Sequence, residues 1–177
     1  MPSARILSIP TFLGVIGINA VPAAGFLVQG WSAEATMLLY LLENVSLTLL
    51  SAARVRLART AAPVSTFLLV GLGFTAVSAT FVAFFLFAIL GTPIDWRQLG
   101  LAFAGIVAFQ LVTLVGAPAD ETLLERTLGR VFLLALGVFI GMVLAYFVER
   151  WFVVPFMAMK TIADVGAQIQ LLRARFG

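Results

Sequence analysis

The residue with the clearest capacity for chemistry is Glu43, at the midpoint of the apolar segment 33–53. If this segment crosses a membrane as a helix, the carboxyl group lies near the bilayer centre, where a charge costs roughly 2.5 kcal/mol or more. Counting along the other apolar segments predicts no Lys, Arg or His at the same depth. We therefore expect a protonated carboxyl group, or a carboxylate that holds a cation or water.

Three side-chain amides fall near the same depth and are expected to form one buried polar cluster with Glu43: Asn19, Asn44 and Gln110. Two interpretations of this cluster stay open. Its members can hold helices together through hydrogen bonds worth about 0.6 to 2 kcal/mol each, or they can form a proton or cation site. Pro22 should kink its helix beside Asn19, because proline has no amide hydrogen and leaves a backbone carbonyl free one turn earlier.

The residue types that are missing narrow the chemistry further. The chain has no Cys and no His, which excludes thiolate nucleophiles, disulfides, Ser-His-Asp catalysis and Cys- or His-bound metals. We expect no metal site, no cofactor and no enzymatic activity. With 11 Lys and Arg against 8 Asp and Glu, the net charge is +3, and no basic stripe favours nucleic acid as a partner.

Composition and spacing predict an all-α fold, a polytopic transmembrane helix bundle. Of the residues, 62% are hydrophobic and 11% are charged, against about a quarter charged in soluble domains. About five segments are apolar enough and long enough to span a bilayer. They occupy residues 6–29, 33–53, 64–90, 99–115 and 131–148, the last extending to 159 if Glu149 and Arg150 do not end it. Residues 120–130, rich in charge, are expected to form a connection at the membrane surface.

The last part of the chain, residues 160–177, is predicted to be an amphipathic C-terminal helix outside the bundle of residues 1–159. Apolar residues recur there at helical spacing, with Lys160 and Asp164 on the opposite face. Such a helix would lie on the membrane or pack on a partner. At this spacing the ammonium and the carboxylate can pair, which usually marks a solvated helix face.

An odd number of spans places Trp31, Trp96 and Trp151 at one membrane interface, where tryptophan is enriched. The same five spans divide the basic residues almost evenly between the two sides. One side has Arg5, Arg54, Arg56, Arg59, Arg126 and Arg130, and the other has Arg97, Arg150, Lys160, Arg173 and Arg175. The first hairpin favours a cytoplasmic N-terminus, because basic residues flank it while its turn has none.

The segment Trp31 to Asn44, which contains Tyr40-Leu41-Leu42-Glu43-Asn44, resembles a pattern in an uncharacterised family of small prokaryotic membrane proteins, DUF6498. The segment Lys160-Thr161-Ile162-Ala163-Asp164 is similar to the closing motif of that family. The resemblance implies a multi-pass protein of the prokaryotic inner membrane and singles out Tyr40, Glu43, Asn44, Lys160 and Asp164. This chain departs from the family pattern at Leu42, where an aromatic residue is usual, and in having no His in the last span.

Three functions are open at this point. The leading hypothesis is a non-catalytic accessory or scaffold subunit that contacts the lipid bilayer and other membrane-protein subunits or its own copies. The alternative is a small proton- or cation-linked channel or transporter that uses Glu43. A lipid- or quinone-modifying enzyme is the least favoured, because no second carboxylate is spaced to assist Glu43.

Overall fold

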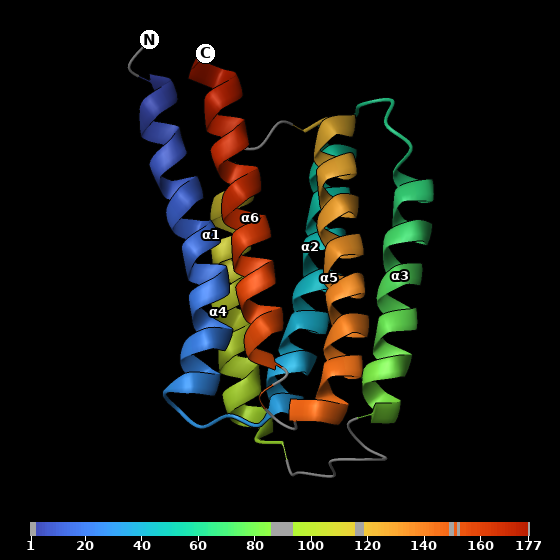
Figure 1. The fold of residues 1–177 in the computed structure, drawn as a ribbon. Coiled ribbons are helices and arrows are strands. Elements are labelled where there is room, and N and C mark those ends of the chain that lie inside the picture. Colours follow the sequence, from blue (N-terminus) through green and yellow to red (C-terminus); the bar gives the residue numbers. More distant parts are fainter. Residues whose placement is uncertain (1–2, 86–93, 116–118, 149–150, 152, 177) are drawn as a thin grey trace.

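The structure is a computed structural model, and it describes residues 3–85, 94–115, 119–148, 151 and 153–176. Within these residues the chain forms six α-helices and no strand (Figure 1). In chain order they are α1 (Ser3–Leu27), α2 (Ala33–Leu57), α3 (Val64–Phe85), α4 (Trp96–Val115), α5 (Glu121–Val148) and α6 (Val153–Phe176). The predicted all-α bundle is confirmed, with one helix for each of the five predicted spans and a sixth, α6, that includes the predicted C-terminal helix.

Consecutive helices run antiparallel, so both termini lie at the same end of the bundle (Figure 1). We call this end the terminal end. The opposite end, which contains the turn between α1 and α2, the start of α4 and the connection between α5 and α6, is called the tryptophan end. Trp31, Trp96 and Trp151 all belong to these segments, so the three tryptophans share one end as the sequence predicts.

The helix α2 is the centre of the bundle and contacts all five other helices. On one side α3 packs against α2 and α5, and on the other side α1 packs against α4 and α6. Three helices, α2, α3 and α4, are long enough and apolar enough to cross a membrane, and a shorter apolar helical stretch covers Phe12–Leu27. The bundle therefore has the dimensions and composition of a membrane-spanning protein.

Side-chain caps fix the starts of three helices. The Ser32 hydroxyl accepts the backbone N–H of Ala35 at the start of α2. One oxygen of Asp95 accepts the N–H groups of Arg97 and Gln98 at the start of α4, and Asp120 caps α5 through the N–H of Thr122. These caps satisfy N–H groups that have no partner within their own helix.

The start of α5 differs from the sequence prediction of a surface connection over residues 120–130. The helix begins at Glu121 and continues without a break to Val148. The reason is that Leu123, Leu124 and Thr127 recur at helical spacing and are buried, so this charged stretch has an inward face that packs like the rest of the helix.

The position of α6 also differs from the prediction. One helix runs through residue 160, where the boundary between the bundle and a separate C-terminal segment was predicted, and it packs against α1 and α5. Its polar residues Lys160 and Asp164 are buried, with 5% and 7% of their surface exposed. The amphipathic face therefore turns toward the other helices, because charged partners for both residues lie there.

Candidate functional site

The site is built around Lys160 of α6, whose ammonium group has three polar neighbours. It donates hydrogen bonds to Oδ1 of Asn19 at 3.1 Å and to Oδ2 of Asp164 at 2.9 Å. Its third neighbour is Oε1 of Glu43, 2.9 Å away. An ammonium group has three N–H donors, so all the hydrogen-bonding directions of Lys160 are directed at this site.

The carboxylate of Asp164 is fully bonded. Arg130 of α5 approaches it with two nitrogens, Nε at 2.9 Å from Oδ1 and Nη2 at 3.0 Å from Oδ2. Asn19 and Lys160 also donate to Oδ2. The paired contact with Arg130 is the bidentate geometry in which guanidinium groups bind carboxylates most strongly.

Asn19 of α1 forms hydrogen bonds with both a carboxylate and a cation of the site. Its amide nitrogen donates to Oδ2 of Asp164 and to the backbone carbonyl of Val15. Its amide oxygen accepts from Lys160 and from the hydroxyl of Thr161. The two donors and two acceptor positions of the amide are thus all used, which fixes its orientation, because a flipped amide would place an NH₂ group against the ammonium.

Glu43 of α2 is bonded less completely than Asp164. It has no exposed surface, and its Oε1 is within ion-pair distance of Lys160 and, at 3.7 Å, of Nη2 of Arg130. Neither Oε1 nor Oε2 has an aligned hydrogen bond within the described residues. Glu43 therefore has unused acceptor capacity in a place without solvent, which is uncommon for a buried polar group.

These four residues, Glu43, Arg130, Lys160 and Asp164, come from three helices and are named the charged quartet. Two carboxylates and two cations give zero net charge if all are ionised, which lowers the cost of burying them. The expectation that no cation lies at the depth of Glu43 is wrong. The linear count missed this arrangement because it placed both cations at the membrane surface, in segments that the structure folds inward as α5 and α6.

An apolar wall separates the quartet from the tryptophan end. Tyr40 of α2 packs edge-on against Phe156 of α6, with ring centroids 4.8 Å apart, and the Lys160 ammonium lies 5.4 Å from the Tyr40 ring. A second buried cluster, Ile18, Leu39, Leu99 and Ile106, fills the space between α1, α2 and α4.

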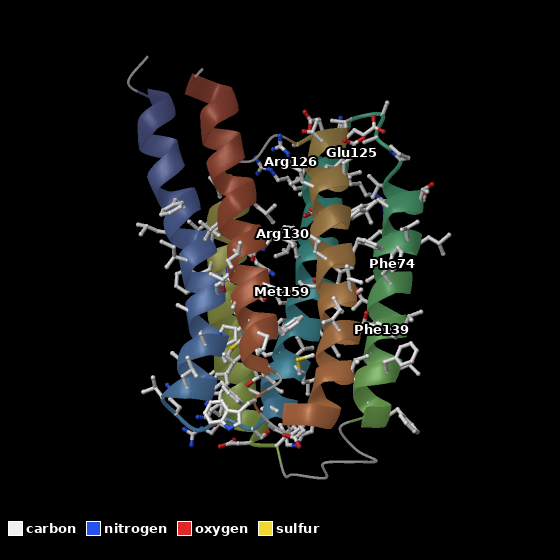
Figure 2. All side chains as sticks on the ribbon, viewed as in Figure 1. Phe74, Glu125, Arg126, Arg130, Phe139 and Met159 are labelled. Carbon is white, nitrogen blue, oxygen red and sulfur yellow. The ribbon has the colours of Figure 1, made fainter. Side chains whose placement is uncertain are left out.

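Of the four members of the quartet, Arg130 alone has a substantial exposed surface. The Arg130 side chain is 22% exposed, whereas those of the other three members are exposed by 5% or less. In Figure 2, Arg130 and Arg126 project from the same side of α5, the side that faces α6. Arg130 is therefore the member of the quartet that a ligand at the surface of the bundle can reach.

The predicted cluster of Glu43, Asn19, Asn44 and Gln110 is assembled only in part. Asn19 shares the site with Glu43 through Lys160. Gln110 of α4 contacts the backbone of Glu43 instead, donating to its carbonyl at 3.0 Å, and accepts from the Ser46 hydroxyl. These bonds join α2 to α4, which favours the helix-joining interpretation for Gln110.

Asn44 is buried but lies outside these contacts, and its Oδ1 has no hydrogen-bond partner within the described residues. Pro22 lies near the end of α1, which remains helical to Leu27. Among the residues that the structure describes, no group of His, Cys, Asp or Glu is arranged to hold a metal ion.

Arg130 is the site residue that sequence reasoning missed. The useful signal was its position on the apolar side of a charged stretch, four residues after Arg126 and followed at once by an apolar segment. A cation at such a boundary can turn inward when a carboxylate on another helix offers a partner, and only the packing of α5 against α6 supplies that partner.

Fold and site together describe a small bundle of antiparallel helices with an ion-paired centre between α1, α2, α5 and α6. A family of unknown function, DUF6498, matches residues 1–175, and the chain belongs to this family. Comparison with curated proteins and with solved structures gives no match. Of the residues that carried the sequence resemblance, the fold brings together Tyr40, Glu43, Lys160 and Asp164, whereas Asn44 lies outside these contacts.

Proposed function

We propose that this protein is a small proton-linked transporter of the cell membrane, and that Glu43 is its proton acceptor. The observation that carries the proposal is the unequal bonding of the two buried carboxylates. Asp164 accepts four hydrogen bonds, whereas Glu43 has its ion-pair contacts on Oε1 alone and its Oε2 has no partner among the described residues. A proton added to Glu43 therefore breaks the fewest contacts, and ionisable groups buried in a membrane commonly serve as proton relays.

The same geometry favours a proton over a metal cation. Lys160 and Arg130 already occupy the positions beside Glu43 at 2.9 and 3.7 Å. A sodium or potassium ion would have to share this space with two positive charges, which repel it strongly where the dielectric constant is low. A proton needs no such space, because it binds directly to a carboxylate oxygen.

The orientation follows from charge. Because α6 lies inside the bundle, its last turns are at the terminal end, together with the start of α1 and the C-terminal end of α2. Among the described residues this end has Arg5, Arg54, Arg56, Arg59, Arg126, Arg173 and Arg175, whereas the tryptophan end has Arg97. Because cytoplasmic segments are enriched in Lys and Arg, both termini are assigned to the cytoplasm.

The orientation can be tested with single cysteines, because the natural chain has none. Ala35→Cys lies near the tryptophan end and Arg59→Cys at the terminal end. In intact cells a membrane-impermeant maleimide should label the first variant and not the second. Labelling of Arg59→Cys alone would reverse the assignment.

Proton flux tests the function. Purified protein is placed in vesicles that contain a pH-sensitive dye, with equal potassium phosphate and valinomycin on both sides to hold the membrane potential at zero, and the outside solution is acidified. The proton flux with wild type should exceed the flux in protein-free vesicles, and the flux with Glu43→Gln should not. Glu34→Gln is the matched control, because Glu34 is also a buried acid of α2 but lies at the tryptophan end.

A protonated carboxyl has a distinct infrared C=O band, which gives a second measurement on the same proteins. This band should appear on acidification in wild type and in Glu34→Gln and be missing in Glu43→Gln. Flux equal to that of empty vesicles in wild type, or undiminished flux in a folded Glu43→Gln protein, contradicts the proposal.

An accessory or scaffold role is the second candidate, and it is supported by an exposed row of aromatic pairs. Phe74 and Phe132 pack edge-on with centroids 5.8 Å apart, and Phe81 and Phe139 do the same at 6.3 Å. All four rings, on α3 and α5, are between 40% and 54% exposed. Phe74 and Phe139 lie along the neighbouring faces of these helices in Figure 2.

A stoichiometric partner recovered from native membranes, or a defined oligomer in nanodiscs, would support this second role. The decisive comparison is between wild type and the double variant Phe74→Ala/Phe139→Ala, which should lose the partner. If wild type purifies as a monomer without other subunits, the scaffold role is excluded.

A further inference from the structure

We propose that Arg130, with Arg126, binds an oxyanion, either a carboxylate or a phosphate group, and that the anion is taken up together with one proton. This inference rests on the proposed function and names the class of substrate. It starts from Arg130, the only member of the charged quartet that reaches the surface.

The guanidinium group of Arg130 has donors to spare. Its Nε and Nη2 atoms bind Asp164, and Nη1 has no hydrogen bond to any described residue. A planar guanidinium fork matches carboxylate and phosphate groups, and its present partner is itself a carboxylate. An incoming oxyanion can therefore share or replace the contact with Asp164 by the same geometry.

Arg126 supplies a second positive charge along the path of approach. It lies one helical turn closer to the terminal end and is exposed, and it interacts electrostatically with Asp120 just before the same helix. Figure 2 shows both arginines on the side of α5 that faces α6, with Glu125 at the top of the helix. The acids at this end, Asp120, Glu121 and Glu125, are exposed, so they are screened by solvent.

Charge balance explains why a proton accompanies the anion. With both carboxylates ionised and both cations present, the buried quartet is neutral. One added anion would leave it with a net charge of minus one, because Arg126 is exposed and its charge is screened by solvent. One proton from the cytoplasmic solution restores neutrality when it binds Oε2 of Glu43, which has no partner among the described residues. Asp164 keeps its bonds from Lys160 and Asn19. No covalent bond other than the O–H bond of Glu43 forms.

The groups that face Glu43 are consistent with its binding a proton when the anion binds. They are Lys160 and Asp164 on α6, Arg130 on α5 and Tyr40 on α2. When the anion draws Arg130 away from Glu43, the carboxylate loses one of its two cations, and the proton becomes easier to bind.

Binding is tested in nanodiscs of phosphatidylcholine with two probes, inorganic phosphate and methanesulfonate. Methanesulfonate has one negative charge and does not titrate, so proton uptake after its addition to a weakly buffered sample comes from the protein. Wild type should bind both probes and take up about one proton per methanesulfonate, as charge balance requires.

Three arginine variants distinguish recognition by the bidentate guanidinium group from attraction by positive charge alone. Arg130→Lys keeps the charge and removes the bidentate fork, and it should weaken binding by about tenfold or more. Arg126→Gln should weaken binding less. Arg56→Gln is the matched control, an exposed arginine at the same end, and should bind as wild type. All variants are first checked for wild-type elution and thermal stability.

The source of the anion is tested with lipids. If the anion is a lipid headgroup, phosphatidylglycerol in the nanodiscs should compete with methanesulfonate for wild type. The lipid should also remain bound in native mass spectrometry of wild type, but not of Arg130→Lys. A soluble ligand should bind equally in both lipids.

The outcomes separate this inference from the proposed function. Equal weakening by Arg56→Gln and Arg130→Lys, or binding without proton uptake, overturns the anion site. If anion binding fails while Glu43→Gln still abolishes proton flux, the proton-linked function stands without it. If wild type binds the anion with proton uptake but shows no flux, the site is correct and the transport proposal is wrong.

Discussion

The ammonium nitrogen of Lys160 lies 2.9 Å from Oε1 of Glu43 and, on its other side, 2.9 Å from Oδ2 of Asp164. One cation thus lies between two carboxylates from different helices, with Arg130 completing the balance. Removing one member of such a buried set costs more than the set contributes as a whole, because the remaining charges are left unpaired.

Lys160→Met should therefore be strongly destabilising. The variant leaves Glu43 with Arg130 as its single cation, at 3.7 Å, and we expect a loss of about 3–5 kcal/mol in the free energy of unfolding. Reversible unfolding in mixed micelles measures this. The double variant Lys160→Met/Glu43→Gln restores zero net charge and should recover part of the loss. If it is as unstable as the sum of the single variants, the two side chains are not coupled.

Asn19→Leu tests the side-chain amide that forms hydrogen bonds with both Lys160 and Asp164. The substitution conserves size but removes four hydrogen bonds, to Val15, Asp164, Lys160 and Thr161. Because the ammonium and the carboxylate keep each other as partners, we expect a loss of about 1–3 kcal/mol, less than for Lys160→Met. The same unfolding assay applies, and a loss larger than that of Lys160→Met would show that Asn19 does more than bridge.

Gly137→Ala tests the contact between α5 and α6. A Cβ atom at Gly137 would lie 2.7 Å from the ring of Phe156, which is buried against Tyr40. We expect the ring to shift and the protein to lose about 1–3 kcal/mol. The matched control is Gly129→Ala on the same helix, where a Cβ atom meets nothing within 4 Å. That control should be neutral or slightly stabilising, because alanine favours helix.

Asp120 gives a pH dependence outside the membrane-spanning segments. The hydroxyl of Thr122, together with nearby backbone N–H groups and Arg126, lowers the pKa of the Asp120 carboxyl below its ordinary value. A depressed pKa means that ionised Asp120 favours folding above its unfolded pKa and that this contribution is lost as the pH falls through the folded pKa. Carbon-13 NMR of the labelled carboxyl should show the lowered pKa, and Asp120→Asn should remove this part of the acid sensitivity. A titration at the ordinary value would contradict the cap.

The sequence was sufficient for the class of fold and for the ends of several helices. A serine directly before an apolar segment favours a helix cap, and Ser32 caps α2. Glu43 was identified because a carboxylate in the middle of an apolar helix requires a physical reason, whatever surrounds it. Arg130 and Lys160 were predicted to lie at the surface, because a charged residue is expected to contact water unless a buried partner is known.

The composition and the spacing of apolar residues by themselves determined that the chain is helical, suited to a membrane, and unable to bind metals through Cys or His. These properties depend on single residues and on near neighbours along a helix. Tertiary structure decided which polar residues meet, because the site joins α1, α2, α5 and α6, and such contacts depend on how the helices pack. It also decided that α6 belongs to the bundle, which moves its basic residues to the terminal end and changes a nearly even charge distribution into a strongly asymmetric one.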